Sequence, residues 1–313
     1  MSTVIVTGAS GFAGSHLVDS LVADAVPVVA WHRPGREPAP AIVKGVTWRA
    51  VDLLDREAVK LAIAESRPSI LFHCAGAAHV GRSWETSEPT FAINVKGTQH
   101  LVDALSELRL STKVLIPSSA TVYATSTEAL TEEHPIRPSS PYALSKLAQE
   151  MVGTDGVASP QVFIARAFNH FGPRQDPWFV ASGFARRIAD IEAGRWEPEI
   201  TAGNLDTCRD LTDVRDTVKA YRIIVQNGRP ARPYNVCSGR TVVIRSLLEQ
   251  MLAKAKVPIQ VRTDPARYRP HDQPIVLGNP QRISHELGWK AEIPLGQTVD
   301  DLLSYWRTRS SAA

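Results

Sequence analysis

The chain has 313 residues, of which 43% are hydrophobic and 21% charged, so it is of ordinary globular composition with ample material for a core. Basic residues exceed acidic ones by only 35 − 32 = 3, and the absence of a basic stripe argues against nucleic-acid binding. No apolar run reaches the roughly 18 residues of a membrane span, and we expect no secretory leader. Three widely spaced cysteines favour neither disulfides nor a zinc site. We therefore expect a cytoplasmic protein with no membrane partner and no metal.

The predicted elements of the first half alternate between short apolar strands and helical stretches. We expect strands at 4–6, 26–31, 46–51, 70–74, 114–116 and 162–165. Between them we expect helices at 13–23, 56–65, 91–108 and 142–152. This alternation is typical of an α/β protein with a doubly wound parallel sheet of the Rossmann type, since β-α-β units place helices on both faces.

The pattern changes after about residue 168, where proline, arginine and tryptophan become denser and the predicted strands shorter. A helix at 214–225 and a strand at 234–237 are predicted to return to the first sheet. We therefore predict one domain over 1–167 plus about 211–238, and a smaller mixed α/β lobe over 168–210 and 239–313.

A glycine-rich turn follows the first predicted strand and opens the first predicted helix. Gly8, Gly11 and Gly14 have the spacing Gly-x-x-Gly-x-x-Gly, which lets the backbone approach a pyrophosphate at a helix N-terminus. Because the turn joins a strand to a helix, a dinucleotide site is favoured over a purely structural turn. The predicted contacts are Gly8, Ser10, Gly11, Phe12, Ala13 and Gly14.

The end of the second predicted strand bears on the choice of dinucleotide. NAD sites usually carry a carboxylate there for the ribose hydroxyls, but this chain has His32 and Arg33. Arg33 and Arg36 suit a 2′-phosphate through charge-assisted hydrogen bonds, and a solvated basic loop is the alternative. NADP(H) is the preferred cofactor, with NAD(H) as the second choice.

A tyrosine and a lysine share one face of the helix predicted at 142–152. Ser140 is expected to cap this helix, with Pro141 in its first position. Tyr142 and Lys146 are four residues apart, and we expect the ammonium group to lower the pKa of the phenol. A phenol with a lowered pKa is suited to proton transfer, although an ordinary aromatic–lysine pair is the alternative.

The strand at 114–116 is followed by the hydroxyls of Ser119 and Thr121. This places them at the carboxyl edge of the sheet, where open α/β sheets bind ligands. A hydroxyl beside a carbonyl oxygen can stabilise the negative charge that develops there.

Together, these motifs resemble the extended short-chain dehydrogenase/reductase family over nearly the whole chain. Besides the glycine turn, they are Val51-Asp52-Leu53, Cys74-Ala75-Gly76-Ala77, Asn94-Val95-Lys96-Gly97-Thr98, the Ser119 segment and Tyr142-x-x-x-Lys146. The resemblance implies a catalytic set of Ser119, Tyr142 and Lys146. It also implies cofactor contacts from Asp52, Leu53, Ala75, Gly76, Ala77, Tyr142 and Lys146.

Two sequence positions and the motifs in the second half of the chain limit the choice of reaction within this family. Nucleotide-sugar dehydratases of this family carry a glutamate just after the catalytic hydroxyl, whereas this chain has Ala120 and Thr121. The machinery for eliminating water is therefore predicted to be missing. The later motifs are Phe168-Asn169-His170-Phe171-Gly172-Pro173, Phe184-Ala185-Arg186-Arg187, Arg209-Asp210-Leu211-Thr212-Asp213 and Arg269-Pro270-His271-Asp272.

These later motifs are similar to the branch of the family that reduces GDP-4-dehydro-6-deoxy-D-mannose at C4 with NADPH, giving GDP-6-deoxy-D-mannose (GDP-D-rhamnose). The resemblance implies substrate contacts from Thr121, Asn169, Arg187, Arg209 and Arg269. A nucleotide-hexose 4-epimerase that retains NAD, and a non-catalytic protein that senses NADP, are the alternatives.

The stretch at 91–108 carries more apolar positions than one narrow stripe. The resemblance implies that this helix pairs with the helix at 142–152 across a homodimer, in a four-helix bundle. The alternative is a helix that only packs on its own sheet.

Overall fold

The computed structural model describes residues 3–35, 45–154, 160–268 and 273–311. Its centre is a seven-stranded sheet of order β10-β6-β5-β4-β1-β2-β3, in which every pairing is parallel. The strands are β1 (Val4–Thr7), β2 (Val28–His32), β3 (Val46–Ala50), β4 (Ile70–His73), β5 (Lys113–Ser119), β6 (Gln161–Ala167) and β10 (Pro233–Val236). Most of the strands read as unbroken apolar runs because helices cover both faces of the sheet.

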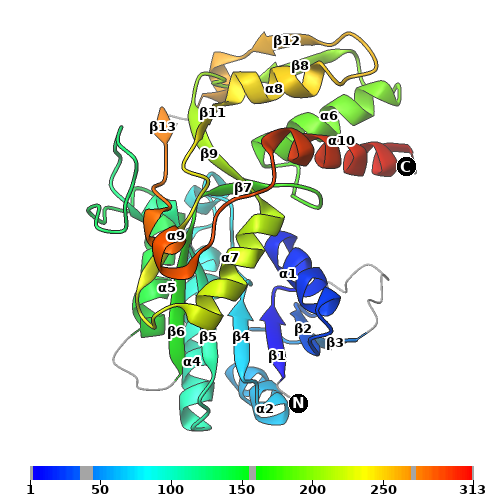
Figure 1. Cartoon of the computed structure of the whole chain (residues 1–313). Coiled ribbons are helices and arrows are strands. Elements are labelled where there is room, and N and C mark those ends of the chain that lie inside the picture. The colour runs from blue at the N-terminus through cyan, green and yellow to red at the C-terminus, as the bar shows by residue number, and fades with distance from the viewer. Residues whose placement is uncertain (1–2, 36–44, 155–159, 269–272, 312–313) are drawn as a thin grey trace.

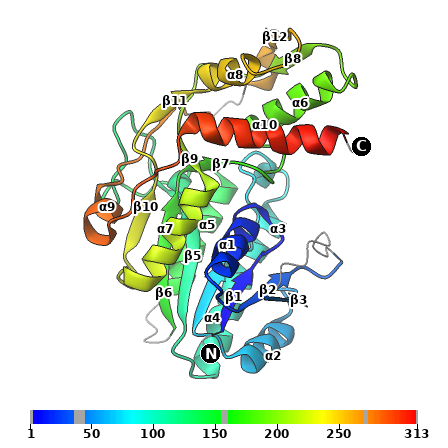
Figure 2. The same cartoon turned by 45° about the vertical axis from the view of Figure 1, so that its right-hand side comes forward.

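Two layers of helices enclose this sheet (Figures 1 and 2). One face is covered by α1 (Phe12–Ala23) and α7 (Val214–Asn227), and the other by α2 (Arg56–Ser66), α4 (Gly97–Glu107) and α5 (Pro141–Thr154). Leu17 and Val218 belong to the core on the first face, and Ile63 and Leu101 to the core on the second. The predicted fold class is confirmed.

The predicted helix at 91–108 is irregular. The prediction of a helix is confirmed, but the helix begins earlier, in α3 (Ser87–Phe91), and contains a π-helical turn η2 (Ala92–Lys96) before α4. The wider turn contains Asn94, which is fully buried. Turns of this kind occur frequently at functional sites.

The smaller lobe lies above the carboxyl ends of the parallel strands (Figure 1). Its strands are β7 (Asn169–Phe171), β8 (Glu199–Ala202), β9 (Cys208–Asp213), β11 (Thr241–Val243), β12 (Gln260–Thr263) and β13 (Ile275–Val276). Its helices are α6 (Val180–Glu192), α8 (Ile244–Leu252) and α10 (Leu295–Ser311), with α9 (Gln281–Leu287) beside β10. Short 3₁₀ turns are η1 (Arg82–Trp84), η3 (Ala120–Val122) and η4 (Pro265–Arg267). Within the described ranges, no helix combines the length and the hydropathy that a bilayer span requires.

Candidate active site

The glycine turn between β1 and α1 is packed too tightly for side chains. Gly8 has φ +61°, and a Cβ built on Gly14 would lie 2.2 Å from the Gly8 carbonyl oxygen. The N-cap residue of α1 is Gly11, which has no side chain that could accept a hydrogen bond from the first turn of the helix. The N–H groups of that turn are therefore available to phosphate oxygens, and the turn fits a dinucleotide.

The segment after β4 closes the other side of this turn, at the point where the strand order reverses. A Cβ on Gly8 would lie 2.6 Å from Ala75 Cα, and one on Gly76 would lie 2.7 Å from Asn94 Oδ1. Asn94 Oδ1 also accepts a hydrogen bond from the Ala77 N–H at 2.8 Å. Dinucleotides bind at such a reversal point in doubly wound sheets.

The residues predicted to contact the adenosine end of the dinucleotide lie just after the strands β2 and β3. Asp52 follows β3 and accepts a hydrogen bond from the Leu54 N–H through Oδ1 at 2.9 Å, and Leu53 is buried. Arg33 is exposed just after β2, so its guanidinium is accessible to an anionic ligand. Arg36 lies outside the described residues.

The structure brings the three predicted catalytic side chains together. Ser119 ends β5, and its hydroxyl hydrogen-bonds the phenol of Tyr142 on α5. One turn further along α5, Lys146 Nζ donates to the Pro117 carbonyl oxygen and to Gln149 Oε1, both at 2.7 Å. The three groups thus lie at the carboxyl edge of β5.

Burial determines the protonation states of Tyr142 and Lys146. It raises the pKa of Tyr142 to about 12, and the hydrogen bond from Ser119 only partly opposes the rise. The expectation that Lys146 lowers the pKa of Tyr142 is wrong for this structure, because the lysine Nζ donates to Pro117 and Gln149 instead. Burial also lowers the pKa of Lys146 to about 8. At neutral pH the phenol is protonated and most of the lysine is charged.

Three polar residues support the catalytic helix, although the sequence reasoning assigned them no role. Ser83 Oγ accepts a hydrogen bond from the Tyr142 N–H at 3.1 Å, and Asn94 Nδ2 donates to Ser145 Oγ at 2.9 Å. Gln149 is fully buried and lies one turn beyond Lys146. This spacing places it on the same face of the helix as Lys146, and it could have been predicted from the sequence. Ser83 comes from η1, a separate 3₁₀ turn that no local sequence pattern connects to α5.

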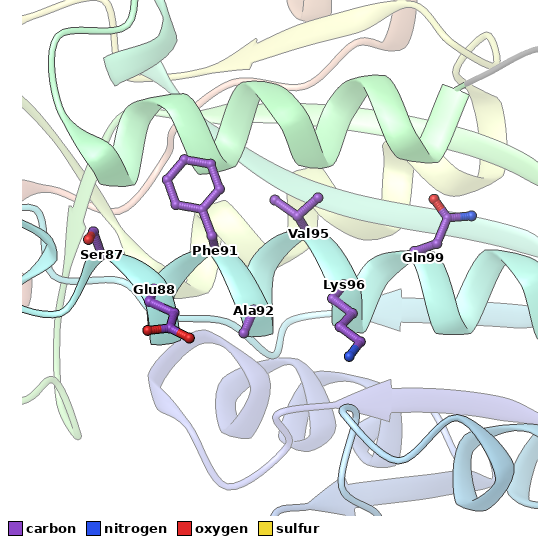
Figure 3. A pocket seen from close by; sticks show the side chains of 7 residues that line it. All are labelled: Ser87, Glu88, Phe91, Ala92, Val95, Lys96 and Gln99. Carbon is purple, nitrogen blue, oxygen red and sulfur yellow. The ribbon is translucent and has the colours of Figure 1, made fainter.

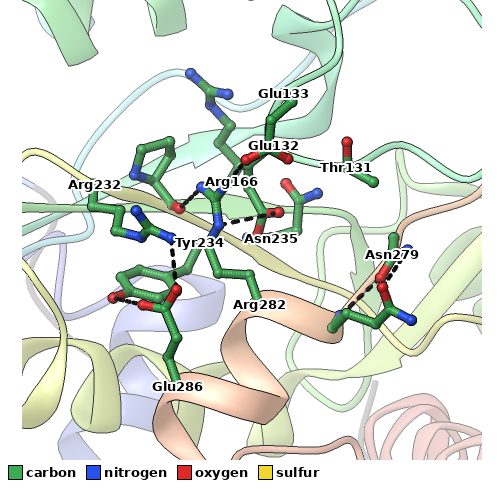
Figure 4. A network of polar contacts seen from close by, with 12 residues as sticks. Thr131, Glu132, Glu133, Arg166, Arg232, Tyr234, Asn235, Asn279, Arg282 and Glu286 are labelled. Carbon is green, nitrogen blue, oxygen red and sulfur yellow. Dashed lines mark hydrogen bonds and ion pairs between the residues drawn. The ribbon is translucent and has the colours of Figure 1, made fainter.

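A buried ion pair anchors both elements that carry the catalytic groups. Arg166 on β6 donates to both carboxylate oxygens of Glu150 on α5, at 3.0 and 2.7 Å. It also donates to the hydroxyl of Tyr123, just after η3, and that hydroxyl donates to Asn235 Oδ1 at 2.7 Å. Figure 4 shows Arg166 and Asn235 within a wider polar network that includes Glu132.

The predicted substrate residues are dispersed over the second half, apart from Thr121. Thr121 Oγ1 lies 3.0 Å from Ser119 Oγ, while Asn169 is exposed on β7. The Arg187 guanidinium on α6 lies 4.0 Å from the centre of the Trp196 ring. Arg209 on β9 donates to the carbonyl oxygens of Cys208 and Gln273, each at 2.8 Å. Arg269 lies outside the described residues.

A doubly wound sheet with a glycine turn, and a tyrosine–lysine pair beside a serine, define the class of the extended short-chain dehydrogenases/reductases. Residues 5–302 match the family model described as GDP-mannose 4,6 dehydratase, and the chain belongs to this family.

Two relatives and one solved structure illustrate the similarity. The chain is 35% identical over 311 residues to GDP-6-deoxy-D-mannose reductase of Pseudomonas aeruginosa, covering 98% of this chain and 97% of the relative. It is 29% identical to UDP-glucose 4-epimerase of Bacillus subtilis, with the same coverage. The structure of RMD from Pseudomonas aeruginosa complexed with NADPH superimposes with a TM-score of 0.87 at 33% identity, covering 99% of this chain and 100% of that one.

Proposed function

We propose that the protein reduces the C4 keto group of GDP-4-dehydro-6-deoxy-D-mannose with NADPH and produces GDP-6-deoxy-D-mannose. The observation that carries this proposal is a protonated, buried Tyr142 phenol beside Ser119, at a site where Ala120 and Thr121 replace the carboxylate of a dehydratase. Such a site can deliver a proton but lacks the acid–base group for water elimination. The similarity to a GDP-6-deoxy-D-mannose reductase supports the same substrate.

The three proposed catalytic residues have different roles in the reduction. Bound NADPH supplies a hydride to C4 of the sugar, which converts the carbonyl to an alkoxide and leaves NADP⁺. The Tyr142 phenol donates its proton to the developing alkoxide and later regains one from solvent. Ser119 donates a hydrogen bond to the same oxygen, and the Lys146 ammonium holds the nicotinamide ribose.

The two parts of the chain hold the two ligands in this proposal. The domain over 1–167 and about 211–238 binds the cofactor, and the lobe over 168–210 and 239–313 binds the nucleotide sugar. Arg33 and Arg36 contact the 2′-phosphate of NADP(H), which is the preferred cofactor over NAD(H). The proposed diphosphate and sugar contacts are Asn169, Arg187, Arg209 and Arg269, with Thr121 near the sugar.

We also propose a homodimer in which a second copy covers the face formed by α3, η2, α4 and α5. A hollow of about 660 Å³ lies on this face, and Figure 3 shows Phe91 and Val95 directed toward α5 along it. On α5 itself, Leu144 and Met151 are 48% and 64% exposed. Four helices from two copies would bury these apolar side chains. Light scattering of the wild type and of Met151→Glu tests this, with a dimer expected for the first and a monomer for the second.

The activity is tested by mixing the protein with NADPH and enzymatically generated GDP-4-dehydro-6-deoxy-D-mannose, and by following cofactor oxidation and products. We expect NADPH to be consumed in step with formation of a GDP-6-deoxyhexose. If NADPH is not consumed and the protein interconverts nucleotide hexoses with an NAD that copurifies with it, the protein is a 4-epimerase and the proposal is wrong.

A further inference from the structure

The Ser119 hydroxyl has three polar neighbours, and its single proton can serve only one of them. The Thr121 N–H lies 3.2 Å from Ser119 Oγ, the Thr121 hydroxyl lies 3.0 Å from it, and the Tyr142 phenol is the third. A serine hydroxyl offers one donor and accepts two hydrogen bonds. The N–H can only donate, so one acceptor position of Ser119 is always taken by the Thr121 backbone.

The remaining two contacts are between hydroxyl groups, and the substrate decides their direction. A keto oxygen only accepts hydrogen bonds, so Tyr142 and Ser119 must both donate to it when it binds. Ser119 then has one acceptor position left, which the Thr121 hydroxyl can fill by donating to it. In this arrangement all the hydrogen-bonding groups of Ser119 are satisfied and its proton is aimed outward.

The turn that holds Thr121 is firmly anchored. Ser119 is the N-cap of η3, with φ −144° and ψ 147°, and the turn is followed by the fully buried Tyr123. The Tyr123 hydroxyl is held between Arg166 and Asn235. Arg166 also binds Glu150 on α5, the helix that carries Tyr142. The backbone that carries Ser119 and Thr121 is therefore held by buried groups on β6, β10 and α5.

We propose that Thr121 is a positioning residue for the reduction, and that its hydroxyl orients the Ser119 proton toward the keto oxygen of the substrate. This inference rests on the proposed function, because it requires a substrate with a carbonyl oxygen at Ser119. It differs from a direct sugar contact by Thr121, because the threonine acts only through the serine.

The test compares Thr121→Val, which keeps the shape and removes the hydroxyl, with Thr121→Ser, which keeps the hydroxyl. For Thr121→Val we expect kcat to fall about 3- to 10-fold, as for the loss of one hydrogen bond, with KM within about twofold of the wild type. Thr121→Ser should restore most of kcat. In a Ser119→Ala background, Thr121→Val should have no further effect, because the group it orients is gone.

Thr112→Val is the matched control. Thr112 is a buried threonine just before β5, and its hydroxyl donates to the Pro68 carbonyl oxygen at 2.7 Å. It loses a hydrogen bond of similar type at the opposite end of the strand, so its kcat should equal that of the wild type. If Thr121→Val does not fold, Thr121→Ala provides the same comparison.

Three results would overturn the inference while leaving the proposed function intact. They are wild-type kcat in Thr121→Val, a raised KM with unchanged kcat, and an equal loss in the Ser119→Ala background, the last two of which indicate direct contact with the sugar. Failure of the proposed function is distinct, since the wild type itself would then not oxidise NADPH with the keto sugar.

Discussion

The cofactor domain and the smaller lobe present their proposed functional groups in different ways. In the cofactor domain, Ser119 and Tyr142 already contact one another, and buried residues from neighbouring strands hold the elements that carry them. In the lobe, Arg187 lies over Trp196 and Arg209 binds two backbone carbonyls, so both of the proposed ligand arginines that the structure describes have partners within the protein. The difference indicates that the groups proposed for proton transfer are already arranged, whereas the arginines proposed to bind the nucleotide sugar would have to exchange their present partners for it.

The largest expected effect comes from removing the proton donor on the cofactor side. Tyr142→Phe should lower kcat by about 100- to 10,000-fold, the usual contribution of a general acid, with NADPH binding nearly intact. Steady-state kinetics and a fluorescence titration with NADPH measure the two effects. Tyr305→Phe, on α10, is the control and should behave as the wild type. Near-normal turnover in Tyr142→Phe would contradict the proposed chemistry.

The next effect is on stability and tests whether the cofactor domain is the prearranged one. Arg166→Met leaves Glu150 buried without its partner, and breaking such a pair typically costs about 3–5 kcal/mol of unfolding free energy. Urea unfolding measures this. The double variant Arg166→Met/Glu150→Met should recover much of the loss, because no unpaired charge remains. Wild-type stability in Arg166→Met would show that the pair is not an anchor.

A smaller effect, on the affinity for NADPH, is expected from a substitution in the glycine turn. Gly14→Ala would place a methyl group against the Gly8 carbonyl and move the turn away from the pyrophosphate. Loss of one or more hydrogen bonds to a charged group corresponds to roughly 10- to 100-fold weaker NADPH binding. Calorimetric titration checks this, with Gly296→Ala as the control, because a Cβ at Gly296 meets open space. Unchanged NADPH affinity in Gly14→Ala would separate this turn from cofactor binding.

On the lobe side, Arg187→Met should raise KM for the nucleotide sugar about tenfold with kcat nearly unchanged, as for the loss of uniform binding to a phosphate. Arg186→Met is the matched control, because the guanidinium of Arg186 lies beside Asp190 and Trp306 instead of Trp196. Equal effects of the two substitutions on KM would remove Arg187 from the proposed binding site.

The smallest effect is a dependence of kcat/KM on pH, which we expect from the titration of Lys146 in the cofactor domain. Burial lowers the pKa of Lys146 to about 8, and the charged form is the one that holds the ribose. Values of kcat/KM should therefore be flat below this pH and decline above it as the ammonium loses its proton. Lys146→Arg should be less active but without this decline, since a guanidinium stays charged. An identical alkaline decline in Lys146→Arg would assign the titration to another group.

Sequence reasoning succeeded where the determinants are local. The strand–glycine turn–helix unit and the Tyr142–Lys146 spacing on one helix predicted the fold class and the family, and both are confirmed. It failed where distant segments meet. The pKa of Tyr142 depends on burial by several elements, and the contact of Ser83 with the catalytic helix depends on the position of η1, a separate 3₁₀ turn. The roles of the individual site residues remain predictions.

The central claim is a net transfer of hydride from an exchangeable cofactor to C4 of a GDP-linked keto sugar. It is tested most directly with NADPH deuterated at the transferable position, and with analysis of the sugar product by NMR. The account predicts one deuterium on C4 of a GDP-6-deoxyhexose for each NADP⁺ formed. A sugar product that carries no deuterium, formed without NADP⁺, would contradict the account, because an epimerase returns its hydride to the sugar from the cofactor it retains.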